Sequence, residues 1–198
     1  MSADTIARLK ITLDDVEPLV LRRIEIPFDI RLDRLHEVLQ AAMGWTNSHL
    51  YEISAGDTGW GLTDPDWPDG PLDARKAKLD RVVEDTGAKT LRYLYDFGDG
   101  WMHTIKIERL VDPVPGERYP RLLEATGRCP PEDVGGPPGY AESLQAIADP
   151  RHERHDECKE WMPENFDPNV IDAEWLAGNL IDLAKRWSRK PSKLAKSK

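Results

Sequence analysis

The eight residues DFGDGWMH at positions 96–103 combine two carboxylates, two glycines and a histidine in one short segment. Asp96, Asp99 and His103 are residue types that bind divalent cations or transfer protons. The same letters fit the tip of a β-hairpin, because Asp and Gly favour tight turns. The segment is therefore either a chemical site or a polar turn, and the flanking residues must decide.

The triplet Asp96-Phe97-Gly98 also matches the metal-binding motif of protein kinases. A kinase additionally needs a Gly-rich loop, a strand lysine and an HRD catalytic loop. The chain supplies none of these motifs, so a kinase is excluded.

Alternation of apolar residues predicts a strand on each side of the segment. The alternating residues are Leu91, Tyr93, Tyr95 and Phe97 before it and Trp101, His103, Ile105 and Ile107 after it. A three-residue loop over 98–100 buries all eight on one face and sets Tyr95 opposite His103. A two-residue turn would pair Asp96 with His103 but would set charged residues against the apolar face. We predict the three-residue loop, with Gly100 in the left-handed conformation.

In this register Asp96 and His103 point to opposite faces of the hairpin and form no pair. His103 then lies on an aromatic face and is expected to be a core residue with one hydrogen-bonded nitrogen. Asp99 remains at the tip.

A second unusual segment is RCPPEDVGGPPGY, residues 128–140. Its prolines and glycines predict a rigid loop that leads into a helix at Pro138 or Gly139. Glu132 and Asp133 are adjacent carboxylates, which can serve as metal ligands or as an acid/base pair. No further ligand spacing is visible, so the pattern favours a helix-entry loop.

Periodicity elsewhere predicts an α+β fold. Alternation predicts strands over 6–13, 19–26 and 49–56, whereas helical spacing predicts one helix over 32–42, ended by Gly44, and another over 175–187. Residues 57–73 have no periodicity and are predicted to form a long loop, whose acids do not fit the calcium-loop spacing. We expect one domain over residues 1–184, with an antiparallel or mixed sheet whose hairpins pack against a few helices.

The charge distribution separates a body from a tail. The 198 residues carry 27 Lys and Arg against 36 Asp and Glu, a net charge of -9. Residues 185–198 hold seven of the bases and no acid, which leaves 20 bases against 36 acids, near -16, for residues 1–184. Such a body repels a phosphate backbone, so only the basic tail, which we predict to be disordered, is expected to contact nucleic acid.

Two cysteines, Cys129 and Cys158, are too few for a disulfide framework, and no CxxC pair exists to build a cysteine zinc site. The sequence also lacks a run of about 18 apolar residues and the apolar region of a signal peptide. We therefore expect a cytoplasmic protein without membrane contact, and we predict no cofactor.

Several long motifs, taken in order, resemble a known family. They are RLKITL, LRRIEIP, LDRLHEVLQAAMGW with HLYEI, LYDFGDGWMHTIKIE, RCPPEDVGGPPGY and NFDPNVID, within residues 5–184. This series resembles the plasmid Ri ORF-three-like family, also labelled insertion-element passenger TnpR-like proteins. The resemblance implies a single α+β domain found beside mobile elements, without a specific activity. Leu21 stands where members often have Trp, and Val134 where many have Cys, which weakens the idea of a thiol metal site in this loop.

The TnpR-like label suggests a resolvase, but the residues do not support one. A serine recombinase needs a nucleophilic Ser supported by several Arg, and a helix-turn-helix that reads DNA. Beyond Ser2, the serines of the body are Ser48, Ser54 and Ser143, and Ser48 has no arginine cluster beside it. The acidic body is also a poor DNA clamp. We interpret the label as genomic neighbourhood rather than chemistry.

Three hypotheses for the function stay open. We favour a non-enzymatic binding or adaptor domain that contacts a protein partner, in a mobile-element or host accessory system. The second hypothesis is a metal-dependent hydrolase or nuclease, and the third is a DNA-associated accessory protein that acts through the basic tail. The candidate ligands or catalytic groups for the second are Asp96, Asp99, His103, Glu132 and Asp133. The candidate contact residues for the first are Trp45, His49, Trp101, Cys129 and Tyr140.

Overall fold

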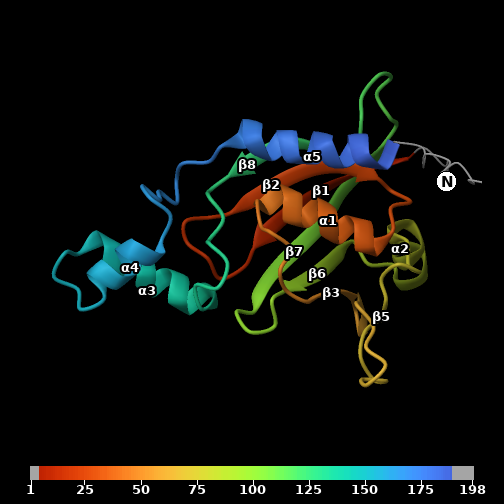
Figure 1. Cartoon of the computed structure of the whole chain (residues 1–198). Coiled ribbons are helices and arrows are strands. Elements are labelled where there is room, and N and C mark those ends of the chain that lie inside the picture. The colour runs from red at the N-terminus through yellow and green to blue at the C-terminus, as the bar shows by residue number, and fades with distance from the viewer. Residues whose placement is uncertain (1–4, 189–198) are drawn as a thin grey trace, which may run out of the picture.

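The alternating segments form one mixed sheet in the computed structural model, which describes residues 5–188 (Figure 1). Its strands are β1 (Ile6–Leu13), β2 (Leu21–Pro27), β3 (Tyr51–Ala55), β4 (Thr58–Gly61), β5 (Leu72–Asp73), β6 (Thr90–Tyr95), β7 (Trp101–Val111) and β8 (Arg121–Thr126). Their order is β5-β4-β3-β6-β7-β1-β2-β8, and neighbours run antiparallel except for β4 and β5. The predicted α+β class with a largely antiparallel sheet is confirmed.

Helices cover this sheet unevenly. They are α1 (Leu32–Met43), α2 (Leu79–Thr86), α3 (Gly136–Ala148), α4 (His155–Trp161) and α5 (Ala173–Ser188). Figure 1 shows α1 lying across the face of the sheet, with α5 beside α1 and along β8, whereas α3 and α4 pair away from that layer. The apolar stripe of α1 is fully buried against the alternating apolar side of β1 in one continuous core.

Strong periodicity in the sequence gives the correct elements. The helix predicted over 32–42 is α1, and it ends at Gly44, whose φ of 84° is the left-handed conformation that glycine adopts without strain. The strand predicted over 6–13 is β1, and the helix predicted over 175–187 is α5.

Weakly periodic segments were predicted less well. Residues 57–73, predicted as a long loop, contain β4 and the two-residue β5, which extend the sheet beyond β3. Such short strands carry too few residues to show alternation. Strand β8 and helix α2 had no predicted counterpart either. In β8 most of the side chains keep some exposure, so the pattern of apolar residues is faint.

The hairpin β6–β7 keeps the predicted faces but not the predicted register. Tyr95 lies opposite Trp101 and Tyr93 lies opposite His103, so the connection is the five residues 96–100 rather than three. Because side chains alternate with a period of two, a shift by two residues keeps the alternating side chains of both strands on the same face. Phe97, which was predicted to be buried on this face, instead lies in the connection and is 44% exposed, so that part of the prediction is wrong. The left-handed Gly100 is confirmed, with φ of 70°.

No helix within residues 5–188 is long and apolar enough to cross a membrane. Helix α5 includes residues 185–188, which the charge pattern assigns to the tail. The other residues of the predicted tail, 189–198, lie outside the part of the chain that the structure describes.

Candidate functional site

The loop that follows α1 carries His49 to the edge of the hairpin tip. Trp45 anchors this loop, because its side chain is buried and its Nε1 donates a hydrogen bond to the Pro130 carbonyl oxygen at 2.9 Å. The backbone N–H groups of Ser48 and His49 point at the Tyr95 hydroxyl oxygen, at 3.0 and 3.3 Å. The His49 ring meets the Tyr95 ring edge-on, with centroids 5.8 Å apart. The imidazole is thereby held at the loop surface, facing the hairpin tip.

Asp96 begins the hairpin connection in a conformation that few residues adopt. Its φ is 55°, in the left-handed region that Asp tolerates better than most side chains. Its Oδ1 accepts hydrogen bonds from the backbone N–H groups of Gly98 at 2.9 Å and Asp99 at 3.4 Å. This leaves Oδ2 free to face His49, whose Nδ1 is 3.6 Å away. The turn therefore fixes a nearly buried carboxylate in one orientation.

The loop over residues 128–135 brings a second carboxylate to the same imidazole. The Asp99 carboxylate accepts a hydrogen bond from the Gly135 N–H at 3.2 Å, and a side chain at Gly136 would overlap the Asp99 carbonyl oxygen. Two adjacent glycines thus allow the loop to dock closely on the hairpin tip. Asp133, with φ of 60°, is presented on the docked loop with its Oδ1 3.2 Å from His49 Nε2.

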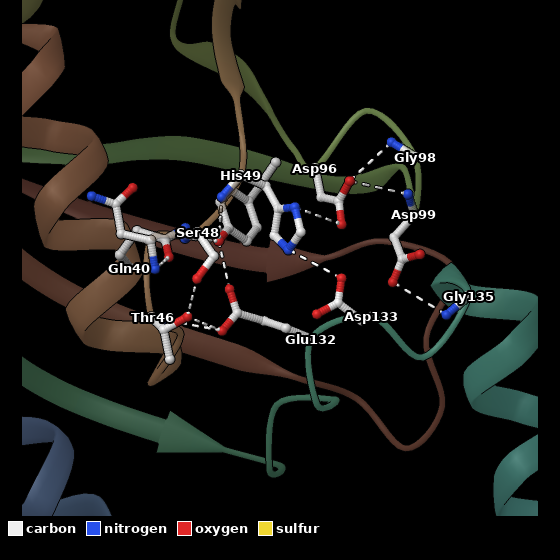
Figure 2. A network of polar contacts seen from close by, with 12 residues as sticks. Gln40, Thr46, Ser48, His49, Asp96, Gly98, Asp99, Glu132, Asp133 and Gly135 are labelled. Carbon is white, nitrogen blue, oxygen red and sulfur yellow. Dashed lines mark hydrogen bonds and ion pairs between the residues drawn. The ribbon is translucent and has the colours of Figure 1, made fainter. Parts of the chain in front are cut away.

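The result is a cluster of one histidine and two carboxylates (Figure 2). One ligand atom from each of His49, Asp96 and Asp133 lies within 4.8 Å of the others. The His49 Nε2 atom is buried and lies 3.2 Å from Asp133 Oδ1, within ion-pair distance. The Asp133 side chain is 70% exposed, so the cluster opens to solvent on that side. An imidazole nitrogen with two carboxylate oxygens suits a transition-metal dication such as Zn²⁺ or Mn²⁺.

Glu132, adjacent to Asp133, is engaged elsewhere. Its carboxylate accepts hydrogen bonds from the Tyr95 hydroxyl at 2.5 Å, and from the Thr46 hydroxyl at 2.6 Å and backbone N–H at 2.9 Å. Burial and this contact with Glu132 raise the pKa of Tyr95 well above its ordinary value. Figure 2 shows Glu132 beside Thr46 and Ser48, on the other side of the loop from Asp96. Glu132 therefore joins the two loops and the sheet rather than serving the cluster.

Comparisons with known proteins agree with this architecture. The family model of the plasmid pRiA4b ORF-3-like protein matches residues 5–175. The chain belongs to this family. It is 59% identical over 187 residues to "Uncharacterized protein y4hQ" of Sinorhizobium fredii (strain NBRC 101917 / NGR234), covering 94% of this chain and 96% of that protein. The crystal structure of MM3350, a protein of unknown function from Methanosarcina mazei Go1, matches with a TM-score of 0.78 and 28% identity, covering 87% of this chain and 98% of that one.

In this family member the two histidines of interest lie in different environments. His103, which we expected to be a core residue and also named among the candidate ligands, is completely buried and does not belong to the cluster. Its Nδ1 lies 3.1 Å from the carbonyl oxygens of Tyr93 and Trp101, as expected for a core histidine. Burial lowers the pKa of His103 to about 4. His49, predicted only as a contact residue, is the histidine that the carboxylates surround, and the sequence signal for this was its place in the loop that ends α1.

The other candidates divide between the cluster and the core. Asp99 supports the cluster by docking the two loops, as described above. Trp45, Trp101 and Tyr140 are at most 9% exposed and pack in the core, although Trp45 also lines the pocket that is described below. Cys129 keeps partial exposure beside the same pocket.

Proposed function

We propose that the protein is a metal-dependent hydrolase that binds one divalent cation through His49, Asp96 and Asp133. The observation that carries this proposal is the convergence of the three side chains, because one ligand atom from each lies within 4.8 Å of the others and His49 Nε2 lies 3.2 Å from an Asp133 oxygen. An imidazole nitrogen and carboxylate oxygens that converge in this way can bind a divalent cation.

The number and placement of the ligands favour catalysis over a structural role. Structural zinc sites usually close four protein ligands around the ion, whereas catalytic sites keep three and leave a position for water. Here three side chains converge, and the exposed Asp133 marks the side open to solvent. A dication lowers the pKa of a bound water molecule, which supplies a hydroxide nucleophile at neutral pH.

The surroundings of the ligands support the same proposal. The Asp96 carboxylate is oriented by two backbone N–H groups, and the loop of Asp133 is docked by Asp99. Hydrogen bonds that fix ligand orientation are a regular feature of metal sites and raise metal affinity.

Calorimetric titration of the chelator-treated protein with Zn²⁺ and Mn²⁺ tests the metal site. We expect saturable binding of one ion per chain, weakened about 100-fold or more in His49→Ala, because one of three ligands is lost. His152→Ala is the matched control, since His152 lies outside the cluster and that variant is expected to bind like the wild type. Equal affinities of the wild type and His49→Ala would contradict the proposal.

Turnover is tested separately, with the metal-loaded protein and a panel of p-nitrophenyl esters and phosphodiesters. We expect hydrolysis that requires the ion and is lost in Asp133→Asn, which removes a ligand charge at an exposed position. Stoichiometric metal binding without turnover of any substrate would contradict the hydrolase. That outcome would instead support the non-enzymatic binding module.

A further inference from the structure

Strand β2 carries a buried arginine that faces no acid. Arg22 is 1% exposed, and its Nε and Nη1 donate hydrogen bonds only to backbone carbonyl oxygens, those of Leu21, Ala42, Thr126 and Gly127, at 2.8–3.0 Å. Within residues 5–188 no carboxylate lies within ion-pair distance of its guanidinium. A buried charge without a counter-ion is costly and uncommon.

Three residues along the same strand, a buried acid is fully paired. Glu25 is also 1% exposed, but its carboxylate forms ion pairs with Arg8 at 2.6 Å and with Arg121 at 2.8 Å. These arginines lower the pKa of Glu25 against the opposing effect of burial. The negative charge of Glu25 on β2 is thus neutralised by two arginines, whereas the positive charge of Arg22 on the same strand has no acidic partner among residues 5–188.

No neighbouring group supplies the missing negative charge. The titratable neighbours of Arg22 include Cys129 and His103. Burial raises the pKa of the Cys129 thiol to about 12, so the thiol is protonated and neutral at pH 7. Burial lowers the pKa of His103 to about 4, so the imidazole is also neutral at this pH. Within residues 5–188 the Arg22 charge is therefore stabilised by backbone carbonyl oxygens, and an anionic ligand would add the opposite charge.

A pocket leads from solvent to Arg22. Its volume is about 450 Å³, within the range of small-molecule sites, and it lies between the end of α1, the loop over residues 128–132 and the start of α5. Its walls include Trp45, Phe166 and Trp175, and the exposed Val170 stands among its lining residues. Aromatic walls around a buried cation suit a ligand with an anionic end and an apolar body.

The charges at the pocket favour a singly charged ligand. Besides Arg22, the lining includes one further cation, Arg128, whose guanidinium stacks over the Phe166 ring at 4.6 Å. Two acids, Glu132 and the exposed Asp172, also line the pocket and accept hydrogen bonds from neighbouring residues. These acids would repel a doubly charged phosphate more than a single carboxylate.

We propose that this pocket binds a small organic carboxylate, whose carboxylate pairs with Arg22 and whose apolar body packs against Phe166 and Trp175. Guanidinium groups bind carboxylates strongly, because the N–H groups match the two oxygens and both partners are charged. This inference does not depend on the metal site, although Glu132 in the pocket wall directly precedes Asp133 of the cluster.

Calorimetry on the wild-type protein tests the pocket without any variant. Benzoate and indole-3-acetate are each compared with their neutral amides, benzamide and indole-3-acetamide, and with inorganic phosphate. We expect saturable binding of at least one carboxylate, about tenfold or more tighter than its amide, and no competition from phosphate. Equal binding of acid and amide would overturn the proposal, as would displacement by phosphate or no carboxylate binding up to about 10 mM.

Substitutions in the pocket then test whether the carboxylate binds beside Arg22. Arg22→Met should abolish carboxylate binding, but it also removes hydrogen bonds that support the fold. Val170→Trp is the second variant, because Val170 is 62% exposed and a larger side chain there narrows the pocket without disturbing the core. Ile181→Trp, at an exposed position of α5 outside the pocket, is its matched control. Unchanged carboxylate affinity in a folded Val170→Trp would overturn the proposal.

His49→Ala separates this site from the proposed metal centre. We expect this variant to keep full carboxylate affinity while it loses the metal ion. Loss of carboxylate binding in His49→Ala would overturn an independent pocket, whereas failure of metal binding alone would contradict only the hydrolase.

Discussion

His49 and His103 both have a buried Nε2 atom, but the surroundings of the two atoms differ. His103 lies within β7, completely covered, and its ring contacts the aromatic rings of Trp45 and Tyr93. His49 lies in a loop, and its two ring nitrogens face Asp96 and Asp133. The Nε2 atom of His103 lies among aromatic rings and serves packing, whereas the ring nitrogens of His49 lie beside carboxylates that could bind a cation.

The comparison also shows how each environment is built. The neighbours of His103 are fixed by strand pairing and burial, which act on the whole hairpin. The neighbours of His49 come from two other loops that are distant in the sequence and are joined by single hydrogen bonds. We therefore expect changes at His103 to act on stability and changes around His49 to act on metal affinity.

The largest expected effect is on stability in His103→Ala. The change leaves a cavity in the core and removes the donor to two carbonyl oxygens. We expect the free energy of unfolding to fall by about 3–4 kcal/mol, measured by urea denaturation. A loss below about 1 kcal/mol would mean that His103 is not part of the core.

Lowering the pH should reduce the free energy of unfolding, because the buried His103 is neutral in the folded protein. The pKa of His103 in the folded protein is about 4, and burial also lowers that of His36 to about 4, against about 6.5 in the unfolded chain. The unfolded state therefore binds protons first, so the contribution of these groups is complete above pH 6.5 and is lost as pH falls towards 4. Each histidine should contribute a loss of up to about 3 kcal/mol. Unfolding free energies of the wild type and His103→Ala at pH 7 and 4.5 test this, because the variant should lose less.

Gly136→Ala should disturb the cluster and leave His103 in place. A methyl group there overlaps the Asp99 carbonyl oxygen, and the φ of 68° is already unfavourable for alanine. We expect a stability loss of about 1–3 kcal/mol and at least tenfold weaker Zn²⁺ binding, because the loop of Asp133 is displaced. Gly87→Ala is the matched control, since its φ is 69° but its added methyl group would meet nothing within 4 Å. Unchanged metal affinity in Gly136→Ala would show that the docking of the loops does not position Asp133.

The smallest effect on stability is expected for His49→Ala. The side chain is partly exposed, and its contacts with Asp96 and Asp133 lie near the surface, so the free energy of unfolding without metal should change by less than about 1 kcal/mol. Thermal or urea denaturation with and without Zn²⁺ measures both states. We expect Zn²⁺ to stabilise the wild type and not this variant. A large loss of stability without metal would place His49 with His103, among the core residues.

Local periodicity was enough to predict much of the fold. Regular apolar spacing predicted β1, α1 and α5 and the buried face of the hairpin, because side-chain direction repeats every two residues in a strand and about every 3.6 in a helix. Asp96, Asp99 and Asp133 were found as candidates since carboxylates beside glycines stand out in any sequence. Strands β5 and β8 were missed because their pairing depends on a neighbour and not on their own pattern.

By itself the sequence determined the apolar faces of the strongly periodic strands and helices and which segments carry reactive groups. The tertiary structure alone decided that the hairpin register is shifted by two residues, and that His49 rather than His103 meets Asp96 and Asp133. It also decided that Glu25 is paired and Arg22 is not. These outcomes depend on contacts between residues far apart in the chain, which periodicity cannot report because it describes only the neighbours of each residue along the backbone.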